Sequence, residues 1–536
     1  MLLRTTSSVL AVLALSTPVF ADVTPAEVWQ NWIEYYKASG YTVTEGSREE
    51  AGETLTLKDV VISIKDPAGE GDVSFTTPEI TLTSTGDGGV RTVMAETSTG
   101  KANFKNEEGE PVTLDGTLTM KGNEVVTSGS AADMTHDSKA AEIVLALDKV
   151  TTAEGEKPFP LSLKFVNVAG HQQHVDGDVI KIDATASADR MELTGAYDDT
   201  DGEKPGRIGF EGGMDALKFA GNFAMPKGVD MSHDMNAALK AGLNIAGTMS
   251  AGAGKFSFDF AGKNDEGADQ AATGSTDMKG FDVNFAMSAD GLKYQGNADA
   301  TLAQLTATDL PFPVSYGIEN ATFDMQIPVM KADQPVPFKF AYSLGGLTLA
   351  DGIWDLFDPS KQLPRDPASI DLDVTGLAKV TMDLFDPANM KAMEEAADGE
   401  ATDAAADPGA ADAAPDAAAD ATADAPASPF EPTEIAVNKF AIAAVGAKID
   451  ASGNLTVPEG GSIDAPVGKM SARMDGLNGL IDKLTQMGFI PEDQVAGIRM
   501  MLAMFAQPAP EGGDALVSEF EFKEGGQIFA NGQQVK

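Results

Sequence analysis

The chain has 536 residues, of which 82 are acidic and 38 basic, so its formal net charge is −44 at pH 7. Such acidity is unsuited to nucleic acid, whose phosphates need basic patches, and it disfavours direct docking on an anionic membrane. The chain has no cysteine, which excludes disulfides, thiol catalysis and an N-terminal lipid-modified cysteine. We expect the acidity to serve mainly solubility.

Residues 1–21 are predicted to be a cleavable signal peptide. Arg4 supplies the positive charge, a short apolar run follows from Val9 to Leu15, and cleavage is expected after Ala21. The run is too short to anchor the protein, and no later stretch reaches the roughly 18 apolar residues of a spanning helix. We therefore expect a periplasmic protein with no transmembrane segment after cleavage.

A helix is predicted directly after the signal peptide. Thr24 and Glu27 form a capping box, Pro25 suits the first helical position, and Gly40 ends the helix. Its apolar face carries Val28, Trp29, Trp32 and Tyr36. This face could dock a partner or a membrane interface. The interpretation that we favour is that it covers the open end of a β structure, since aromatic stripes are usually core.

The region 22–393 is otherwise dominated by an alternation of apolar and polar residues. The pattern is clear at Leu55, Leu57, Val60, Ile62 and Ile64 and recurs along the chain, separated by turns rich in Asp, Gly and Asn. Short alternating runs of this kind indicate antiparallel sheet with one buried face. The predicted fold class is mainly β: a large antiparallel meandering sheet, curled into a groove, a sandwich or an open barrel.

The string Asp-Leu-Phe-Asp-Pro occurs twice, ending at Pro359 and at Pro387. In each copy Asp followed by Pro is typical of a helix N-cap and first helical residue, so a strand is expected to hand over to a short helix. The four aspartates could instead form a catalytic carboxylate group, which geometry must test. They are Asp355, Asp358, Asp383 and Asp386.

Residues 394–429 consist almost wholly of Ala, Asp, Pro and Thr, with 10 acidic residues and no basic one. Such a segment cannot bury a core, and we predict a disordered insertion. Residues 430–536 are predicted to complete the same fold with strands, two helices and a final hairpin turning at Gly525 and Gly526. A methionine cluster on the second helix, Met500, Met501 and Met504, could be an adaptable binding face, but ordinary core is the expected role.

The end of the chain resembles an uncharacterised exported family of alphaproteobacteria, known as domain of unknown function 2125 (DUF2125). The resemblance rests on the segments 479–484, 500–505 and 526–532, and also on Leu363-Pro364-Arg365-Asp366-Pro367 and the opening helix. It implies a periplasmic protein without an assigned activity, matched over nearly the whole mature chain except the insertion. The long β meander is also similar, as a fold, to AsmA-like envelope proteins, whose sheets form lipid-holding grooves.

Motifs for catalysis are missing from the sequence, and we predict no catalytic, cofactor-binding or metal-ligating residues and no cofactor. The four histidines are His136, His171, His174 and His233. His171 and His174, near Asp176 and Asp178, are the only cluster with ligand-like chemistry. Residues three apart on a strand face opposite ways, so the pair converges only in a loop or helix. An exposed turn is the expected setting rather than a metal site.

Three classes of function remain open. The leading one is a non-enzymatic periplasmic scaffold that binds a lipid, another hydrophobic ligand or an envelope partner protein. The second is an outer-membrane β-barrel, although Lys536 at the end and the two helices fit it poorly. The third is a hydrolase that uses paired carboxylates. The sequence does not predict the oligomeric state.

Overall fold

The structure is a computed structural model. It describes residues 22–38, 40–65, 71–106, 109–199, 205–229, 231, 234–264, 266–393, 428–458, 463 and 465–536. The predicted signal peptide, His233 and nearly all of the predicted insertion lie outside the described residues.

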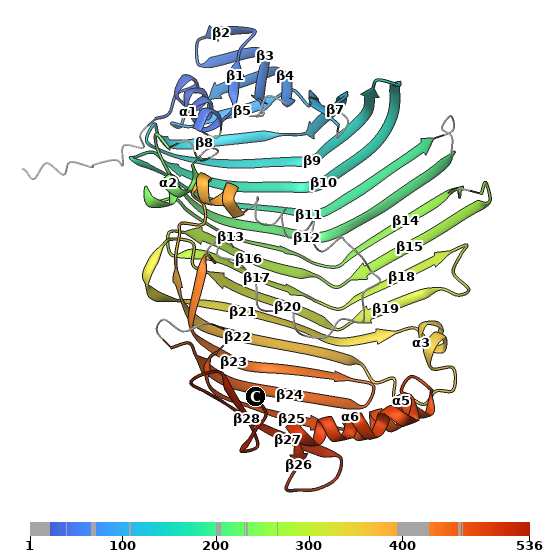
Figure 1. Ribbon diagram of the computed structural model, residues 1–536. Helices are drawn as coiled ribbons and strands as arrows, with labels where there is room; N and C mark the ends of the chain where they lie inside the picture. The colour runs from blue at the N-terminus through green and yellow to red at the C-terminus, as the bar shows by residue number, and fades with distance from the viewer. Residues whose placement is uncertain are drawn as a thin grey trace, which may run out of the picture.

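The described strands form one antiparallel sheet (Figure 1). The first group is β1 Thr42–Thr44, β2 Ser47–Ala51, β3 Thr54–Lys65, β4 Gly71–Ser84, β5 Val90–Met94, β6 Thr97–Lys105, β7 Pro111–Lys121, β8 Glu124–Ser130, β9 Asp133–Thr152, β10 Gly155–Val175, β11 Val179–Asp199 and β12 Gly206–Pro226. The middle group is β13 Asn244–Ala251, β14 Gly254–Lys263, β15 Asp269–Met278, β16 Phe281–Ser288, β17 Gly291–Ala298, β18 Thr301–Ala307, β19 Val314–Ile318, β20 Asn320–Ile327 and β21 Ala332–Leu349. The last group is β22 Ala368–Val380, β23 Phe430–Ala444, β24 Ala447–Thr456, β25 Val467–Asp475, β26 Gln507–Pro508, β27 Ala515–Lys523, β28 Gln527–Ala530 and β29 Gln533–Gln534.

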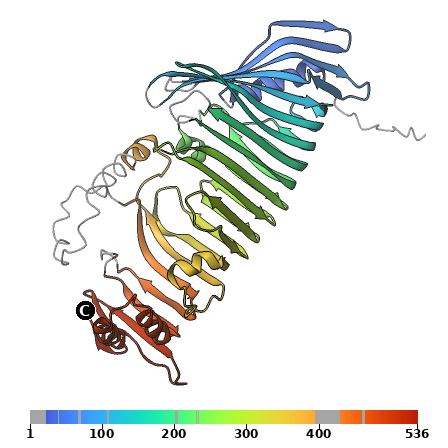
Figure 2. The ribbon, with the colours of Figure 1, turned by 90° about the vertical axis from the view of Figure 1, so that its right-hand side faces the viewer.

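The chain runs up and down the sheet, and several strands lie end to end. For example, β12 pairs with both β13 and β14, and β21 pairs with both β19 and β20. The pairing of β22 with β23 joins the strands on the two sides of the predicted insertion. Figure 2 shows the strands stacked from the N-terminal to the C-terminal end in a single twisted layer. Among the described strands the sheet does not close on itself and has no second sheet against it, so an open curved sheet is observed.

A crease crosses the sheet at the middle of the long strands. At this line strand pairing is interrupted in one strand after another, and the strands bend there (Figure 1). The unpaired positions include Asp59, Pro78, Ala141, Asn167, Asp189 and Ala216, and the gaps between collinear strands continue the line. Backbone φ is positive at Asp59, Asn167 and Ala216, at 50°, 51° and 54°. The crease is therefore a defined local backbone conformation that recurs in successive strands.

The crease keeps apolar side chains on one face of the sheet. An unpaired residue shifts the alternation by one, so apolar residues change between odd and even positions where a strand crosses the crease. In β3, Leu57 and Val60 lie on the two sides of Asp59, and both are fully buried in one core. Without the extra residue, one half of each strand would turn its apolar side chains to the opposite face.

The described helices are α1 Pro25–Ala38, α2 Met235–Lys240, α3 Asp351–Phe357, residues 387–393, α5 Leu477–Gln486 and α6 Glu492–Phe505. Of these, α1, α2 and α6 cover parts of the apolar face. The core under α1 is built around Trp29 and β3–β5, and that under α2 around Leu239 and Val329. At the other end, the Phe505 ring of α6 lies 6.4 Å from that of Phe520 in β27, on the same face. The expected role of α1, to cover an end of the β structure, is confirmed.

Local details separate the sequence predictions that hold from those that do not. The capping box is present, because the Thr24 N–H donates to Glu27 Oε2 over 2.9 Å and the Glu27 N–H to Thr24 Oγ1 over 3.3 Å. Helices α5 and α6 and the final hairpin lie where expected. The expectation of core packing for Met500 is wrong: this side chain is 69% exposed, because α6 lies at the end of the sheet with no buried residue.

Candidate functional site

The apolar face carries a continuous row of residues without charge. The strand register places them directly opposite one another across twelve strands, which corresponds to about 50 Å at the usual strand spacing. In order they are Ile62, Phe75, Gly100, Gly116, Leu147, Leu161, Gly195, Phe210, Phe258, Gly274, Leu305 and Val314. Neighbouring rows on this face are also apolar. On the central strands they include Phe256, Leu193 and Tyr316.

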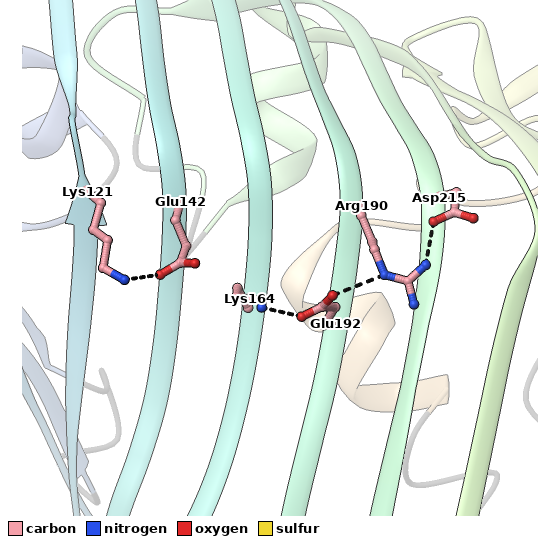
Figure 3. A network of polar contacts seen from close by, with 6 residues as sticks. All are labelled: Lys121, Glu142, Lys164, Arg190, Glu192 and Asp215. Carbon is pink, nitrogen blue, oxygen red and sulfur yellow. Dashed lines mark hydrogen bonds and ion pairs between the residues drawn. The ribbon is translucent and has the colours of Figure 1, made fainter.

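The opposite face is polar. One residue further along the same central strands, the register aligns Ser162, Thr194, Glu211, Ser257, Ser275, Gln304 and Ser315. Ion pairs cross this face (Figure 3). Lys121 Nζ lies 2.7 Å from Glu142, Arg190 contacts Glu192 at 3.1 Å and Asp215 at 2.6 Å, and Lys164 also pairs with Glu192. The sheet therefore has two faces of opposite chemistry.

Much of the apolar face is open to solvent. Outside the areas under the helices, Phe75, Leu145 and Phe258 are 39%, 41% and 38% exposed. Among the described strands up to β22, all but one of the large apolar side chains exposed to this degree belong to this face, and Leu302 is the exception. Soluble monomers rarely expose continuous apolar surface beyond a few hundred Å², and larger patches mark interaction sites.

Aromatic rings lie flat over glycines of the adjacent strand. A Cβ atom added at Gly274 would come within 2.1 Å of the Phe258 ring, and one at Gly195 within 2.2 Å of Phe210. In both cases the ring and the glycine are directly opposite in the register. The same arrangement occurs in the pairs Phe75–Gly100, Phe256–Gly212, Phe285–Gly247 and Phe338–Gly376. The rings cover the glycine backbone and produce a smooth, low apolar surface.

The open surface is hollowed at its centre. A depression of about 500 Å³ is lined by Leu193, Phe210, Phe256, Phe258, Leu305 and Tyr316. Its lining also includes smaller neighbouring residues and Glu211 and Gln304, which the strand register assigns to the polar face. We call the apolar surface from Phe75 to Tyr316 the apolar floor. It lies across the crease from α1 and α2 and has the chemistry of a site for a hydrocarbon chain, since it offers area without hydrogen-bond partners.

The carboxylates of the repeated Asp-Leu-Phe-Asp-Pro string do not converge. One copy precedes β22 and the other follows it, so they lie at opposite ends of a 13-residue strand. Asp355 and Asp351 pair with Arg365, while Asp383 Oδ2 accepts from Lys240 Nζ at 2.7 Å. The bonds from Lys240, Lys331 N–H and Asn236 lower the pKa of Asp383, opposite to what a general acid needs.

The first copy also corrects the predicted helix start. Helix α3 ends at Phe357, before Asp358, and the buried Asp358 carboxylate accepts the N–H groups of Gln362 and Leu363 at 2.8 Å each. Burial opposes ionisation, but those bonds and Arg365 outweigh it and lower its pKa. In the second copy the prediction is confirmed, because a helix begins at Pro387 and Asp386 Oδ1 accepts the Ala388 N–H. Both copies are structural turns.

His171 and His174 lie on strand β10, not in the expected exposed turn. They face opposite ways, as spacing on a strand requires: His171 Nδ1 lies 2.8 Å from Asp137 on the polar face, and His174 is buried. Within the ranges that the structure describes, no three His, Cys, Asp or Glu side chains are grouped to hold a metal. Asp176 pairs with Lys227 rather than with either histidine.

His136, which was not assigned a role in the sequence, lies beneath α1. Its Nδ1 is 2.8 Å from Thr127 Oγ1, and its ring is edge-on to Trp32 with centroids 6.4 Å apart. Burial, aided by the nearby His174 and opposed by Asp137, lowers the pKa of His136 to about 4. The imidazole is therefore neutral in the folded protein at neutral pH, with α1 packed over it.

The packing of aromatic rings on glycines of the adjacent strand gives a prediction for stability. Gly274→Ala should destabilise the fold by about 1–3 kcal/mol, because the Phe258 ring must lift to admit a methyl group. Gly296, on the same face, has no atom within 3.8 Å of an added Cβ. Gly296→Ala should be neutral or stabilise by about 0.5 kcal/mol through a less flexible unfolded chain. Urea unfolding of the two variants measures this; equal effects would contradict the ring–glycine packing.

His136 predicts a pH dependence of stability. Its pKa is about 4 in the folded chain and near 6.5 when unfolded, so stability is complete above about pH 6.5 and falls as the pH drops toward 4. The loss attributable to this group is about 2 kcal/mol at pH 5. His136→Gln, which keeps a partner for Thr127, should lose correspondingly less between pH 7 and pH 5 in urea unfolding. An unchanged pH slope would contradict the assignment.

None of the helices among the described residues has the length and apolarity to cross a bilayer.

Comparison with known proteins places the chain in a family. No curated protein and no solved structure matches the chain, so the similarity to AsmA-like proteins stays a prediction. A family model described as an uncharacterised protein conserved in bacteria matches residues 253–529, a shorter stretch than the sequence analysis expected and about half of the chain. The chain therefore belongs to the DUF2125 family.

Proposed function

We propose that this protein binds lipid, with the hydrocarbon chains lying on the apolar floor. The observation that carries the proposal is the uncharged row from Phe75 to Val314, whose large side chains are more than a third exposed at several positions. Covering such side chains with hydrocarbon gains roughly 25 cal/mol for each Å² of apolar surface removed from water. The proposed role is that of a non-enzymatic scaffold.

The floor favours hydrocarbon over a peptide. An added peptide strand binds to a free sheet edge through main-chain hydrogen bonds, but the strands of the floor are paired on both sides. The rings of Phe210 and Phe258 lie flat on glycines, so they leave no alternating pockets for peptide side chains. A smooth surface without polar partners suits a flexible chain that has no hydrogen bonds to satisfy.

The floor also disfavours a second copy of the protein packed face to face. Two packed sheets interdigitate their side chains over a layer about 10 Å thick. Here α1 and α2 stand on the apolar face at one side, and α6 stands on it at the C-terminal end. A second sheet could not approach the whole face past these helices, whereas a narrow lipid chain could lie between them.

We also propose that the protein acts in the periplasm, as the predicted signal peptide implies. The expected mature chain begins at Asp22. Val23 is 3% exposed and its N–H donates to Gly88 O at 3.1 Å, so the start of this chain is held against the sheet. Acidic, cysteine-free composition is compatible with that compartment.

The floor is tested with two substitutions at adjacent residues on opposite faces. Leu305→Asp places a charge on the floor, and Gln304→Asp places the same charge on the polar face. We expect delipidated protein to bind a long-chain fluorescent fatty acid, and Leu305→Asp to weaken binding at least about tenfold, because burying a carboxylate under hydrocarbon is costly. Gln304→Asp should bind like the unaltered protein.

Mass spectrometry of solvent extracts from the purified protein supplies the second measurement. Lipid should accompany the unaltered protein and Gln304→Asp and be depleted from Leu305→Asp. Urea unfolding of both variants checks that the fold is kept. Absence of lipid in all three proteins, together with equal binding of the fatty acid by the two variants, would refute lipid binding on the floor.

The location has its own test. Osmotic shock without detergent should release the full-length gene product into the periplasmic fraction, with Asp22 as its N-terminal residue by mass spectrometry of the intact chain. Changing Ala21 to a bulky residue should slow processing, because signal peptidase accepts small side chains at that position. Recovery in the cytoplasmic fraction with residues 1–21 still attached would contradict export.

A further inference from the structure

A second depression lies between α1 and the turn that follows β12. It has a volume of about 300 Å³ and is apolar on one side, where Ile180, Met225 and Val229 line it. On the other side it is polar, with Asn31, Glu34 and Lys37 from α1 and His174, Asp176 and Lys227 from the strand ends. The size is that of a small polar group rather than of a long chain.

The charges are balanced among the described residues that line this pocket. They include two ammonium groups, on Lys37 and Lys227, and two carboxylates, on Glu34 and Asp176, and Lys227 forms an ion pair with Asp176. A purely anionic ligand would meet both carboxylates, and a purely cationic one would meet both ammonium groups. A ligand that carries one charge of each sign can be paired at both ends, which reduces the cost of removing charges from water.

His174 provides the polar group without a partner. It is 4% exposed, it lines the pocket, and its Nε2 has no hydrogen-bond partner, although buried polar atoms normally have one. Burial lowers the pKa of His174, Asp176 and Glu34 oppose this, and Lys227 adds to it. All three charged residues line the pocket together with His174. A bound ligand that donates to or accepts from Nε2 would satisfy this atom.

The pocket is continuous with the apolar face. His174 stands in the same cross-strand row as Ile182, Phe223 and Ile245. Met225, which lines the pocket, lies two residues from Phe223 on this face, and Phe223 stacks on Phe219 with ring centroids 6.4 Å apart. Phe219 is opposite Met249, which is 46% exposed. An amphipathic molecule could therefore place its polar end in the pocket and its chain along the sheet.

We infer that this pocket holds the zwitterionic phosphate headgroup of a lipid whose chains lie on the apolar face. The inference rests on the proposed function and extends it to the class of lipid. The phosphate lies among His174, Lys37 and Lys227, and the ammonium group of the headgroup faces Glu34 and Asp176. The helix α1 thereby has a second role, because it forms one wall of the headgroup site as well as covering the core.

The test compares lipids that share their chains and differ in headgroup. Short-chain phosphatidylethanolamine, phosphatidylglycerol and diacylglycerol each displace fluorescent fatty acid that is bound beside the pocket, at Phe219 and Met249, in delipidated protein. We expect phosphatidylethanolamine to act at a concentration at least about fivefold lower than the other two. His174→Ala and Lys227→Ala should bring its value to that of diacylglycerol, while displacement by diacylglycerol stays unchanged.

The controls separate headgroup recognition from folding and from chain binding. His171→Ala changes the neighbouring histidine on the polar face and should leave all three values as they are. His174→Gln keeps an amide that can pair with the ligand and should retain part of the preference. Urea unfolding of each variant shows that it is folded. Met249→Asp, which places a charge on the apolar face beside the pocket, should lower binding of all three lipids.

Two outcomes would overturn the inference. Equal displacement by the three lipids in the unaltered protein would mean that the protein does not recognise the headgroup. The proposed binding of lipid chains on the floor would not be contradicted by this result. Displacement by free phosphoethanolamine at the same concentration as by the lipid would assign the pocket to a small soluble zwitterion instead. Failure of every lipid to displace the probe, together with equal binding of the fatty acid by Leu305→Asp and Gln304→Asp, would refute the proposed function itself.

Discussion

The structure depends on keeping apolar side chains on one face of a single sheet while its long strands bend. A strand with strict alternation can do this only if it runs straight, because a one-residue change of phase turns every following side chain to the other face. The crease solves the problem in all the long strands together. Where β3 has Asp59 unpaired, β4 has Pro78 unpaired opposite it, so both strands shift and the register continues. The bend and the division into two faces are thus one feature.

The division into faces explains how an exposed apolar surface is tolerated. Ion pairs and hydroxyl groups cover the opposite face, and the chain's net charge of −44 makes copies repel each other. The sheet edges are short or charged: β1 has 3 residues, β29 has 2, and every residue of β2, Ser47–Ala51, is exposed with Arg48, Glu49 and Glu50 among them. Such edges discourage strand addition by another chain. The apolar floor can therefore stay open to solvent.

The sequence predicts the alternation of side chains along the strands better than it predicts the overall shape of the sheet. Alternation identifies strand β3 and the antiparallel class, and the capping box of Thr24 identifies α1, because both are local properties. The change of phase between Leu57 and Val60 is visible in the sequence, but its meaning depends on matching changes in the paired strands, which lie far along the chain. For the same reason Met500 is predicted as core: its apolarity is local, whereas its exposure depends on where the sheet ends.

The candidate site likewise depends on contacts between residues that are far apart in the sequence. Phe258 and Gly274 are each ordinary strand residues in the sequence, and only the register makes them a ring lying on a glycine. His174 was singled out as a possible ligand, but its pocket requires α1, which is more than 130 residues away along the chain. Residues that converge through long-range pairing leave no spacing pattern, so neither the floor nor the pocket has a motif.

The extent of the family match bears on how the two proposed parts of the site are related. Residues 253–529 include β14, β15, β18 and β19, which carry Phe258, Leu305 and Tyr316 of the floor. The pocket at His174 and helix α1 lie before the matched segment. The matched segment therefore contains only one end of the floor, because Phe75, Leu193 and Phe210 also precede residue 253. The floor continues across the boundary of the family match, because Phe210 of β12 lies directly opposite Phe258 of β14.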